Sequence, residues 1–233
     1  MDSTKKQARV AGFLYLLGAI IAPIGLMLVP SRLIVGGDAA ATADNIRASE
    51  SLFRIGIASE LIHQIIFIFL VLALYRLFKV VDQNLAVLMV ILGALVSVPI
   101  VFLSVLNEIA ALVLLSGADF VSVFDKSQLD TLAYLFLRLH SQGINLAAIF
   151  WGLWLFPFGI LVIRSGFIPR VLGFLLMMAG FAYPVNSFTS LLLPQYADTV
   201  SQFAMVLYFG ELPIIFWLLI WGAKEQRSDA PAS

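Results

Sequence analysis

Six long apolar segments constrain this chain more than any other feature of its sequence. They cover residues 10–29, 52–78, 85–115, 129–163, 168–193 and 200–222. An α-helix needs about 20 mainly apolar residues to cross the hydrocarbon core of a bilayer, and each segment reaches that length. Hydrophobic residues make up 61% of the chain and charged residues only 12%. The sequence therefore predicts an all-α integral membrane protein, one domain over residues 1–233 with six transmembrane helices arranged as three helical hairpins.

Charged residues in the loops and at the ends of these segments predict how the chain is oriented. The N-terminus, the C-terminus and alternate loops carry an excess of positive charge, contributed by Lys5, Lys6, Arg9, Arg76, Lys79, Arg164, Arg170, Lys224 and Arg227. The opposite loops carry more acidic than basic residues. Because Lys and Arg are enriched in cytoplasmic loops, we expect both termini to lie in the cytoplasm.

Composition also excludes several classes of function. The formal net charge is zero, so a basic surface for nucleic acid is not expected. The absence of cysteine excludes disulfides, thiolate nucleophiles and cysteine-ligated metals. The sequence contains no P-loop, dinucleotide fingerprint or Gly-x-Ser-x-Gly elbow, and we expect no cofactor. The expected partners are membrane lipid and a small-molecule ligand, and the oligomeric state is left open.

Polar residues inside the apolar segments are the candidate functional residues, because such residues are costly in a membrane unless they meet partners or water. With the orientation above, they fall in the outer half of the membrane or at its midplane. They are Glu60, His63, Gln64, Asn107, Glu108, Arg138, His140, Gln142, Asn145, Tyr183, Asn186 and Glu211. We expect them to line a polar chamber, opening outward or lying just beneath the outer surface, that binds a small polar or amphipathic ligand.

Arg138 is the expected centre of this chamber. Ser141, Gln142 and Asn145 follow it at i+3, i+4 and i+7, which places all four residues on one helix face. We expect that face to turn into the protein, where Arg138 would pair with Glu60 or, across one short loop, with Glu108. The alternative is that this ion pair only holds the helices together.

A metal site is the second hypothesis. Glu60 and His63 form a Glu-x-x-His motif, whose spacing puts both side chains on one helix face. Together with His140 they could hold zinc in an intramembrane enzyme that acts on a lipid-like substrate. Because only one such motif occurs and an arginine is nearby, we expect no metal, and whether the chain is an enzyme is left open. A structural or accessory subunit with a polar core is the third hypothesis.

Local signals predict where helices begin and break. In the loop over residues 30–51, Gly36-Gly37 predicts a turn. Asp38 can cap a short helix through Ala39–Ala43, or the helix starts later in the loop. This segment could cover the outer mouth of the chamber as a lid, or simply link two spans along the interface. Four prolines are expected to interrupt helices, namely Pro99, Pro157, Pro184 and Pro213.

Several stretches resemble a known family. They are residues 31–54, the sequence Leu-Ser-Gly-Ala-Asp at 115–119, the sequence Arg-Ser-Gly-Phe-Ile-Pro-Arg at 164–170, and Gly-Glu-Leu at 210–212. They are similar to the DUF4386 domain family, bacterial multi-pass membrane proteins of unknown function, and the resemblance covers residues 8–222. It implies a bacterial inner (plasma) membrane protein with about six spans. It implies no activity, substrate or catalytic residue.

Overall fold

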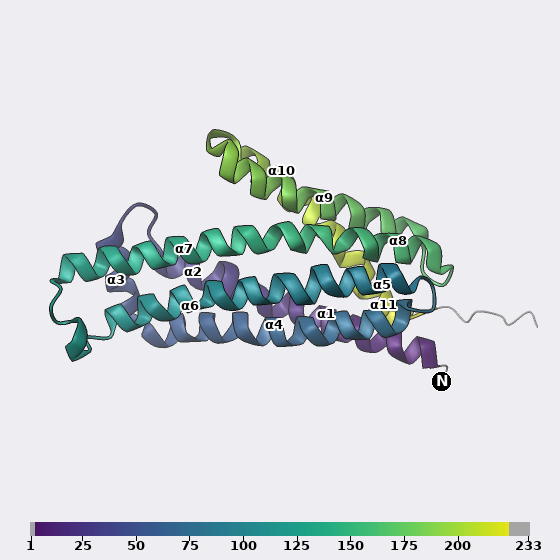
Figure 1. The fold of residues 1–233 in the computed structure, drawn as a ribbon, viewed down its shortest axis with the longest axis horizontal. Coiled ribbons are helices and arrows are strands. Elements are labelled where there is room, and N and C mark those ends of the chain that lie inside the picture. The colour runs from purple at the N-terminus through teal and green to yellow at the C-terminus, as the bar shows by residue number, and fades with distance from the viewer. Residues whose placement is uncertain (1–2, 224–233) are drawn as a thin grey trace, which may run out of the picture. The chain divides into compact units, whose positions relative to one another are not determined.

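The computed structural model describes residues 3–223, and within them the chain is helical with no strand. Six helical segments are long and apolar enough to cross a membrane (Figure 1). They are Thr4–Leu33, Glu50–Phe78, Gln83–Leu115, Lys126–Ser165, Arg170–Leu192 and Pro194–Ile220. Each overlaps one predicted segment, with ends that differ by a few residues. The predicted all-α fold with six membrane-spanning helices is confirmed, whereas their pairing as hairpins stays a prediction.

The chain divides into two compact units. Unit 1 comprises residues 1–16, 67–96 and 148–233, and unit 2 comprises residues 17–66 and 97–147. Three helices contribute residues to both units, namely α1 (Ser3–Pro23), α4 (Glu50–Phe78) and α7 (Lys126–Leu153).

Unit 2 contains residues 17–23 of α1, 50–66 of α4 and 126–147 of α7, together with five complete elements. These are the π-helix η1 (Ile24–Leu28), α2 (Val29–Leu33), α3 (Ala39–Ala48), α6 (Ser97–Leu115) and the 3₁₀ turn η3 (Asp119–Val121). Pro23 directly precedes η1, and its missing N–H removes a bond from the regular helical ladder. Short π-helical segments are frequent at functional sites, and this one lies against Glu60 of α4.

The short helix α3 begins where the sequence predicts it. The Asp38 side chain accepts a hydrogen bond from the N–H of Ala41 at 2.9 Å, and Gly37 has a φ of 80°. That backbone conformation favours glycine, so the turn and the cap are both encoded locally. The helix continues to Ala48, five residues beyond the expected end.

Ion pairs fasten α3 to α7 in unit 2. Asp130 of α7 is only 3% exposed, and its two oxygens accept from Arg47 at 2.5 Å and Lys126 at 2.9 Å. Lys126 also donates to Asp44 at 2.9 Å, and this hydrogen bond lowers the pKa of the exposed Asp44 carboxyl. The buried carboxylate of Asp130 is therefore held by one cation from α3, Arg47, and one from its own helix α7, Lys126.

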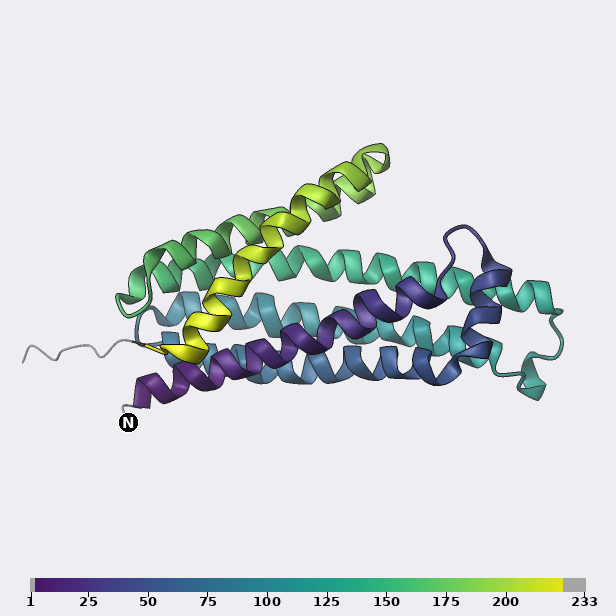
Figure 2. The same cartoon turned by 180° about the vertical axis from the view of Figure 1, so that it is seen from behind.

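Unit 1 contains its parts of α1, α4 and α7 and eight complete elements. These are α5 (Gln83–Val90), the π-helix η2 (Ile91–Val96), α8 (Leu155–Ser165), α9 (Arg170–Leu192), the 3₁₀ turn η4 (Pro194–Tyr196), α10 (Ala197–Tyr208), the 3₁₀ turn η5 (Phe209–Glu211) and α11 (Leu212–Ile220). Helix α9 contacts both α8 and α10 (Figures 1 and 2). A Cβ on Gly173 of α9 would lie 2.5 Å from the carbonyl oxygen of Gly159 on α8, so these two backbones pack directly.

The prolines have different effects. Pro157 follows the break between α7 and α8, Pro213 follows the 3₁₀ turn η5, and Pro99 follows the π-helix η2. Pro184 lies inside an unbroken α9, so the expected interruption there is wrong. The carbonyl that Pro184 frees belongs to Gly180, and it packs against Gly152 of α7, where a Cβ would lie only 2.4 Å away. The absence of a side chain on Gly152 lets a neighbouring backbone cover the freed carbonyl, and the helix continues.

Candidate functional site

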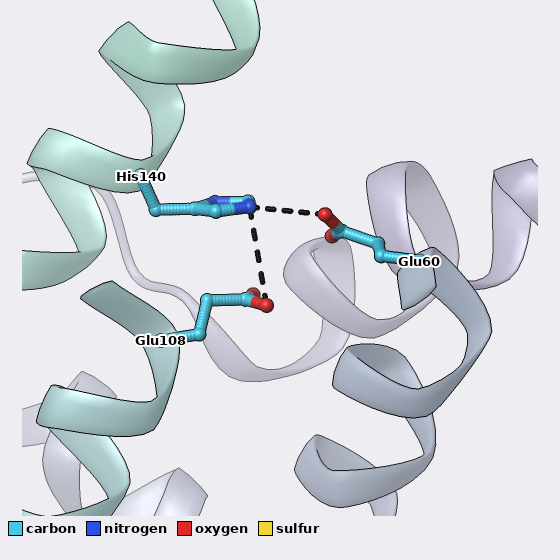
Figure 3. A group of neighbouring side chains, drawn as sticks. All are labelled: Glu60, Glu108 and His140. Atoms are coloured by element: carbon cyan, nitrogen blue, oxygen red, sulfur yellow. Dashed lines mark hydrogen bonds and ion pairs between the residues drawn. The ribbon is translucent and has the colours of Figure 1, made fainter. Parts of the chain in front are cut away.

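Three ionisable side chains of unit 2 point toward one another. They are Glu60 of α4, Glu108 of α6 and His140 of α7 (Figure 3). The Nε2 atom of His140 lies 3.1 Å from Oε2 of Glu60 and 3.9 Å from Oε2 of Glu108. The three residues are 2%, 4% and 8% exposed, in that order. We call this group the Glu–Glu–His cluster.

Glycines allow the backbones to approach at this cluster. On the π-helix η1, a Cβ at Gly25 would lie 2.5 Å from Cγ of Glu60, so only glycine leaves room for that side chain. On α7, a Cβ at Gly143 would lie 2.0 Å from Oγ of Ser104 on α6. Gly143 is three residues after His140, and Ser104 is four residues before Glu108, so each close contact lies one helical turn from a cluster residue. The glycine contact therefore sets how closely His140 and Glu108 approach.

The cluster leaves hydrogen-bonding capacity unused. Among the described residues, Oε1 of Glu60 and Oε2 of Glu108 are buried without a hydrogen-bond partner. A buried carboxylate that lacks a partner costs several kcal/mol unless it takes up a proton or meets a cation. Two carboxyl groups and one imidazole thus converge where a positive charge is needed.

The spacing of the three ligand atoms suits a metal ion. Atoms bound at about 2.1 Å around a tetrahedral centre lie about 3.4 Å from one another. The distances from His140 Nε2, 3.1 and 3.9 Å, fall on either side of that value, and all three ligand atoms lie within 4.8 Å of one another. Small side-chain movements would bring them to bonding distance.

Arg138 does not occupy the place expected for it. Its side chain is exposed, as are Ser141 and Gln142 on the same face, and among residues 3–223 no ion pair forms with it. The expected pairing of Arg138 with Glu60 or Glu108 is therefore wrong, and His140 stands in its place. Residues two apart on a helix point about 200° apart, so α7 cannot bury His140 and Arg138 on one face.

His63, which the metal hypothesis included as a ligand, also lies elsewhere. Its Nδ1 atom is 3.0 Å from Nε2 of Gln64, and the ring packs beside Gly18 of α1. The group that the structure brings together contains Glu108 in place of His63. Asn107 donates to carbonyls of its own helix. Asn145 is half-buried.

The remaining candidate residues belong to unit 1. The Tyr183 hydroxyl donates to Oε1 of Glu211 at 2.8 Å, and the Tyr15 hydroxyl donates to Oε2. Tyr208 stacks on Tyr183 and makes a hydrogen bond with Asn186. The sequence analysis missed Tyr15 and Tyr208, although a hydroxyl inside an apolar segment is a signal that could have found them. The expected residues thus fall into two groups, one within each unit.

Comparison with known proteins agrees with this architecture. An uncharacterized protein of Archaeoglobus fulgidus is 35% identical over 81 residues, which are 35% of this chain and 47% of that protein. The chain thus spans about half the length of the curated relative it matches. No solved structure matches the chain. The family profile described as "Domain of unknown function (DUF4386)" matches residues 10–222. With six apolar helices spread over that same range, this multi-pass membrane protein belongs to the DUF4386 family.

Proposed function

We propose that this membrane protein binds one divalent transition-metal ion, with zinc the best fit, at the Glu–Glu–His cluster. The observation that supports the proposal is the convergence of three buried ligand atoms from three helices, with two carboxylate oxygens left without hydrogen-bond partners. Two carboxylates and a neutral imidazole carry two negative charges, which a divalent cation cancels. From the sequence we expected a small polar or amphipathic ligand and no metal. We now take up the metal hypothesis instead, with Glu108 in place of His63.

Arg138 does not oppose the binding of a metal ion at the cluster. A fixed positive charge beside the cluster would repel a divalent cation. Arg138 is exposed on the other side of α7 from His140, and the cluster is buried. The cluster therefore presents negative charge and one imidazole nitrogen to an incoming ion.

The number of ligands favours a site with an open position. Structural zinc sites are closed by four protein ligands, whereas catalytic sites use three and keep a position for water or substrate. The cluster supplies three protein ligands, one each from Glu60, Glu108 and His140. Metal-assisted chemistry within the membrane is thus better supported than a purely structural polar core.

Metal content is the direct test. The full chain, purified in detergent with a histidine-free tag and equilibrated with zinc, is expected to retain about one ion per chain after removal of free metal. Glu60→Gln, Glu108→Gln and His140→Gln should each weaken zinc binding by about 100-fold, because each removes one of three ligands. Elemental analysis and a competing chelator measure both quantities.

His63→Gln is the matched control for this experiment. It removes the other histidine of the chain but no member of the cluster, so zinc binding should be unchanged. Retention of zinc by His140→Gln, or its loss in His63→Gln alone, would overturn the proposed ligand set. If the wild-type chain binds no zinc, the proposed metal site is rejected.

We further propose that the protein lies in the plasma membrane with both termini in the cytoplasm, which places the cluster in the outer half. The loop charges support this orientation. The chain has no cysteine, so single exposed cysteines report sidedness without background. Ser122→Cys should react with an impermeant maleimide on intact cells, and Gln83→Cys should react only after lysis. The reverse pattern would invert the proposed orientation. A further inner position, Ser228, lies outside the described residues.

A further inference from the structure

Glu211 of unit 1 stands at a break in the helical backbone. Helix α10 ends at Tyr208, the 3₁₀ turn η5 follows, and α11 starts directly after Glu211, with Pro213 in its first turn. Each carboxylate oxygen of Glu211 accepts one tyrosine hydroxyl, from Tyr183 and Tyr15. Two hydroxyl groups, one at each oxygen, are partners that suit an ionised carboxylate.

This carboxylate has no cationic side chain opposite it. Across residues 3–223, the ion pairs that the structure contains do not include Glu211. Arg9, a cation of the same unit, donates instead to the backbone carbonyl of Ile220. A negative charge inside a membrane segment is costly without a positive partner, so a cation from outside the chain would be stabilised beside an ionised Glu211.

Aromatic rings lie beside the two tyrosines that hold this carboxylate. Tyr208 stacks on Tyr183 with ring centroids 4.0 Å apart, and Trp151 meets Tyr183 edge to face at 6.4 Å. On the other side of the carboxylate, Tyr15 lies 6.2 Å from Trp154. Ring faces carry negative potential and attract cations, most strongly where water is excluded.

The combination selects one kind of cation. Calcium and magnesium need six or more oxygen ligands, whereas this group offers one carboxylate and phenol oxygens that already donate to it. An organic ammonium needs only one negative charge and apolar or aromatic surfaces for its substituents. Glu211, Tyr183, Tyr208 and Trp151 are all partly exposed.

We propose that Glu211, with the rings of Tyr183, Tyr208 and Trp151, binds an organic ammonium ion that carries apolar substituents. Glu211 supplies the charge, Tyr15 and Tyr183 hold the carboxylate in place, and Tyr208 and Trp151 contact the substituents. This site lies within unit 1 and does not depend on the metal proposed for unit 2.

Equilibrium dialysis of radiolabelled benzyltrimethylammonium against the full chain in lipid nanodiscs tests the proposal. The cation should bind saturably, and its uncharged carbon analogue neopentylbenzene should not compete. Glu211→Gln is expected to weaken binding at least about tenfold, and Tyr208→Leu by about three- to tenfold, because the first removes the charge and the second removes a ring. Tyr208→Phe keeps the ring and should stay within about twofold of wild type.

Glu50→Gln is the control variant, because it neutralises an exposed glutamate paired with Arg54 and should leave the affinity unchanged. Thermal unfolding shows which variants are folded. Equal binding by a folded Glu211→Gln chain, competition by neopentylbenzene, or absence of saturable binding to wild type would each overturn the proposal. If Glu211→Gln does not fold, the contrast between Tyr208→Leu and Tyr208→Phe decides, and equal affinities would reject the site.

Discussion

Gly143→Ala is expected to lower the thermal unfolding midpoint and to abolish zinc binding at the Glu–Glu–His cluster. The new Cβ would lie 2.0 Å from Oγ and 2.9 Å from Cβ of Ser104, so α6 and α7 must separate at that point. Overpacking of this kind costs about 1–3 kcal/mol or more, which outweighs the gain of about 1 kcal/mol from replacing a mid-helix glycine. We expect the midpoint to fall by about 3–8 °C in a thermal scan.

A compensating change tests whether the contact with Ser104, and not general misfolding, causes the loss of stability. Ser104→Gly removes both atoms that the new Cβ would meet, so the double variant Ser104→Gly/Gly143→Ala should recover most of the midpoint and the zinc. Gly36→Ala is the matched control, because a Cβ at Gly36 meets nothing within 4 Å, and a change below about 0.5 kcal/mol is expected. Strictly additive effects of the two changes would contradict the explanation, since residues in contact should couple.

Removing both cations around Asp130 is expected to destabilise the protein far more than removing either one. Arg47 and Lys126 each hold one oxygen of this buried carboxylate, at 2.5 and 2.9 Å. With one cation gone, the other still pairs with Asp130, so each single change to glutamine should lower stability only slightly. With both gone, a buried charge is left unpaired, which costs about 3–5 kcal/mol and lowers the unfolding midpoint by about 10 °C.

A third change tests whether the unpaired charge on Asp130 causes the loss of stability in the double variant. Asp130→Asn, added to the double variant, removes the unpaired charge and should restore part of the lost stability. Arg54→Gln is a suitable control, because its pair with Glu50 is 58% and 47% exposed and such surface pairs contribute about 0–1 kcal/mol. Equal stabilities of the double and triple variants would show that Asp130 is not a buried ion in solution.

The spans were predictable because each depends on a local property of the chain. Length and apolar character alone placed all six segments to within a few residues. The start of α3 was equally local, since Asp38 and Gly37 satisfy the backbone of neighbouring residues. Pro184 was misjudged because the outcome depends on a distant residue, Gly152, whose missing side chain lets another backbone cover the freed carbonyl.

The candidate site was only partly predictable, for a reason specific to membrane helices. Glu60, Glu108 and His140 were all recognised as polar residues within apolar segments. Which face of α7 turns inward was not encoded in its periodicity, because lipid-facing and protein-facing positions are both apolar. The sequence therefore centred the site on Arg138, whereas the close contact between Gly143 and Ser104, one turn from His140, holds that side of α7 against α6.

The distance along the chain between the cluster residues has a consequence for how the protein is made. Glu60 and His140 are 80 residues apart, so a ribosome adding about 5–20 residues per second completes His140 about 4–16 s after Glu60. During that interval Glu60 is in the translocon or in lipid without its partner His140. The cluster is complete only when α7 has joined α4 and α6, so the metal proposed here can load only late in membrane insertion.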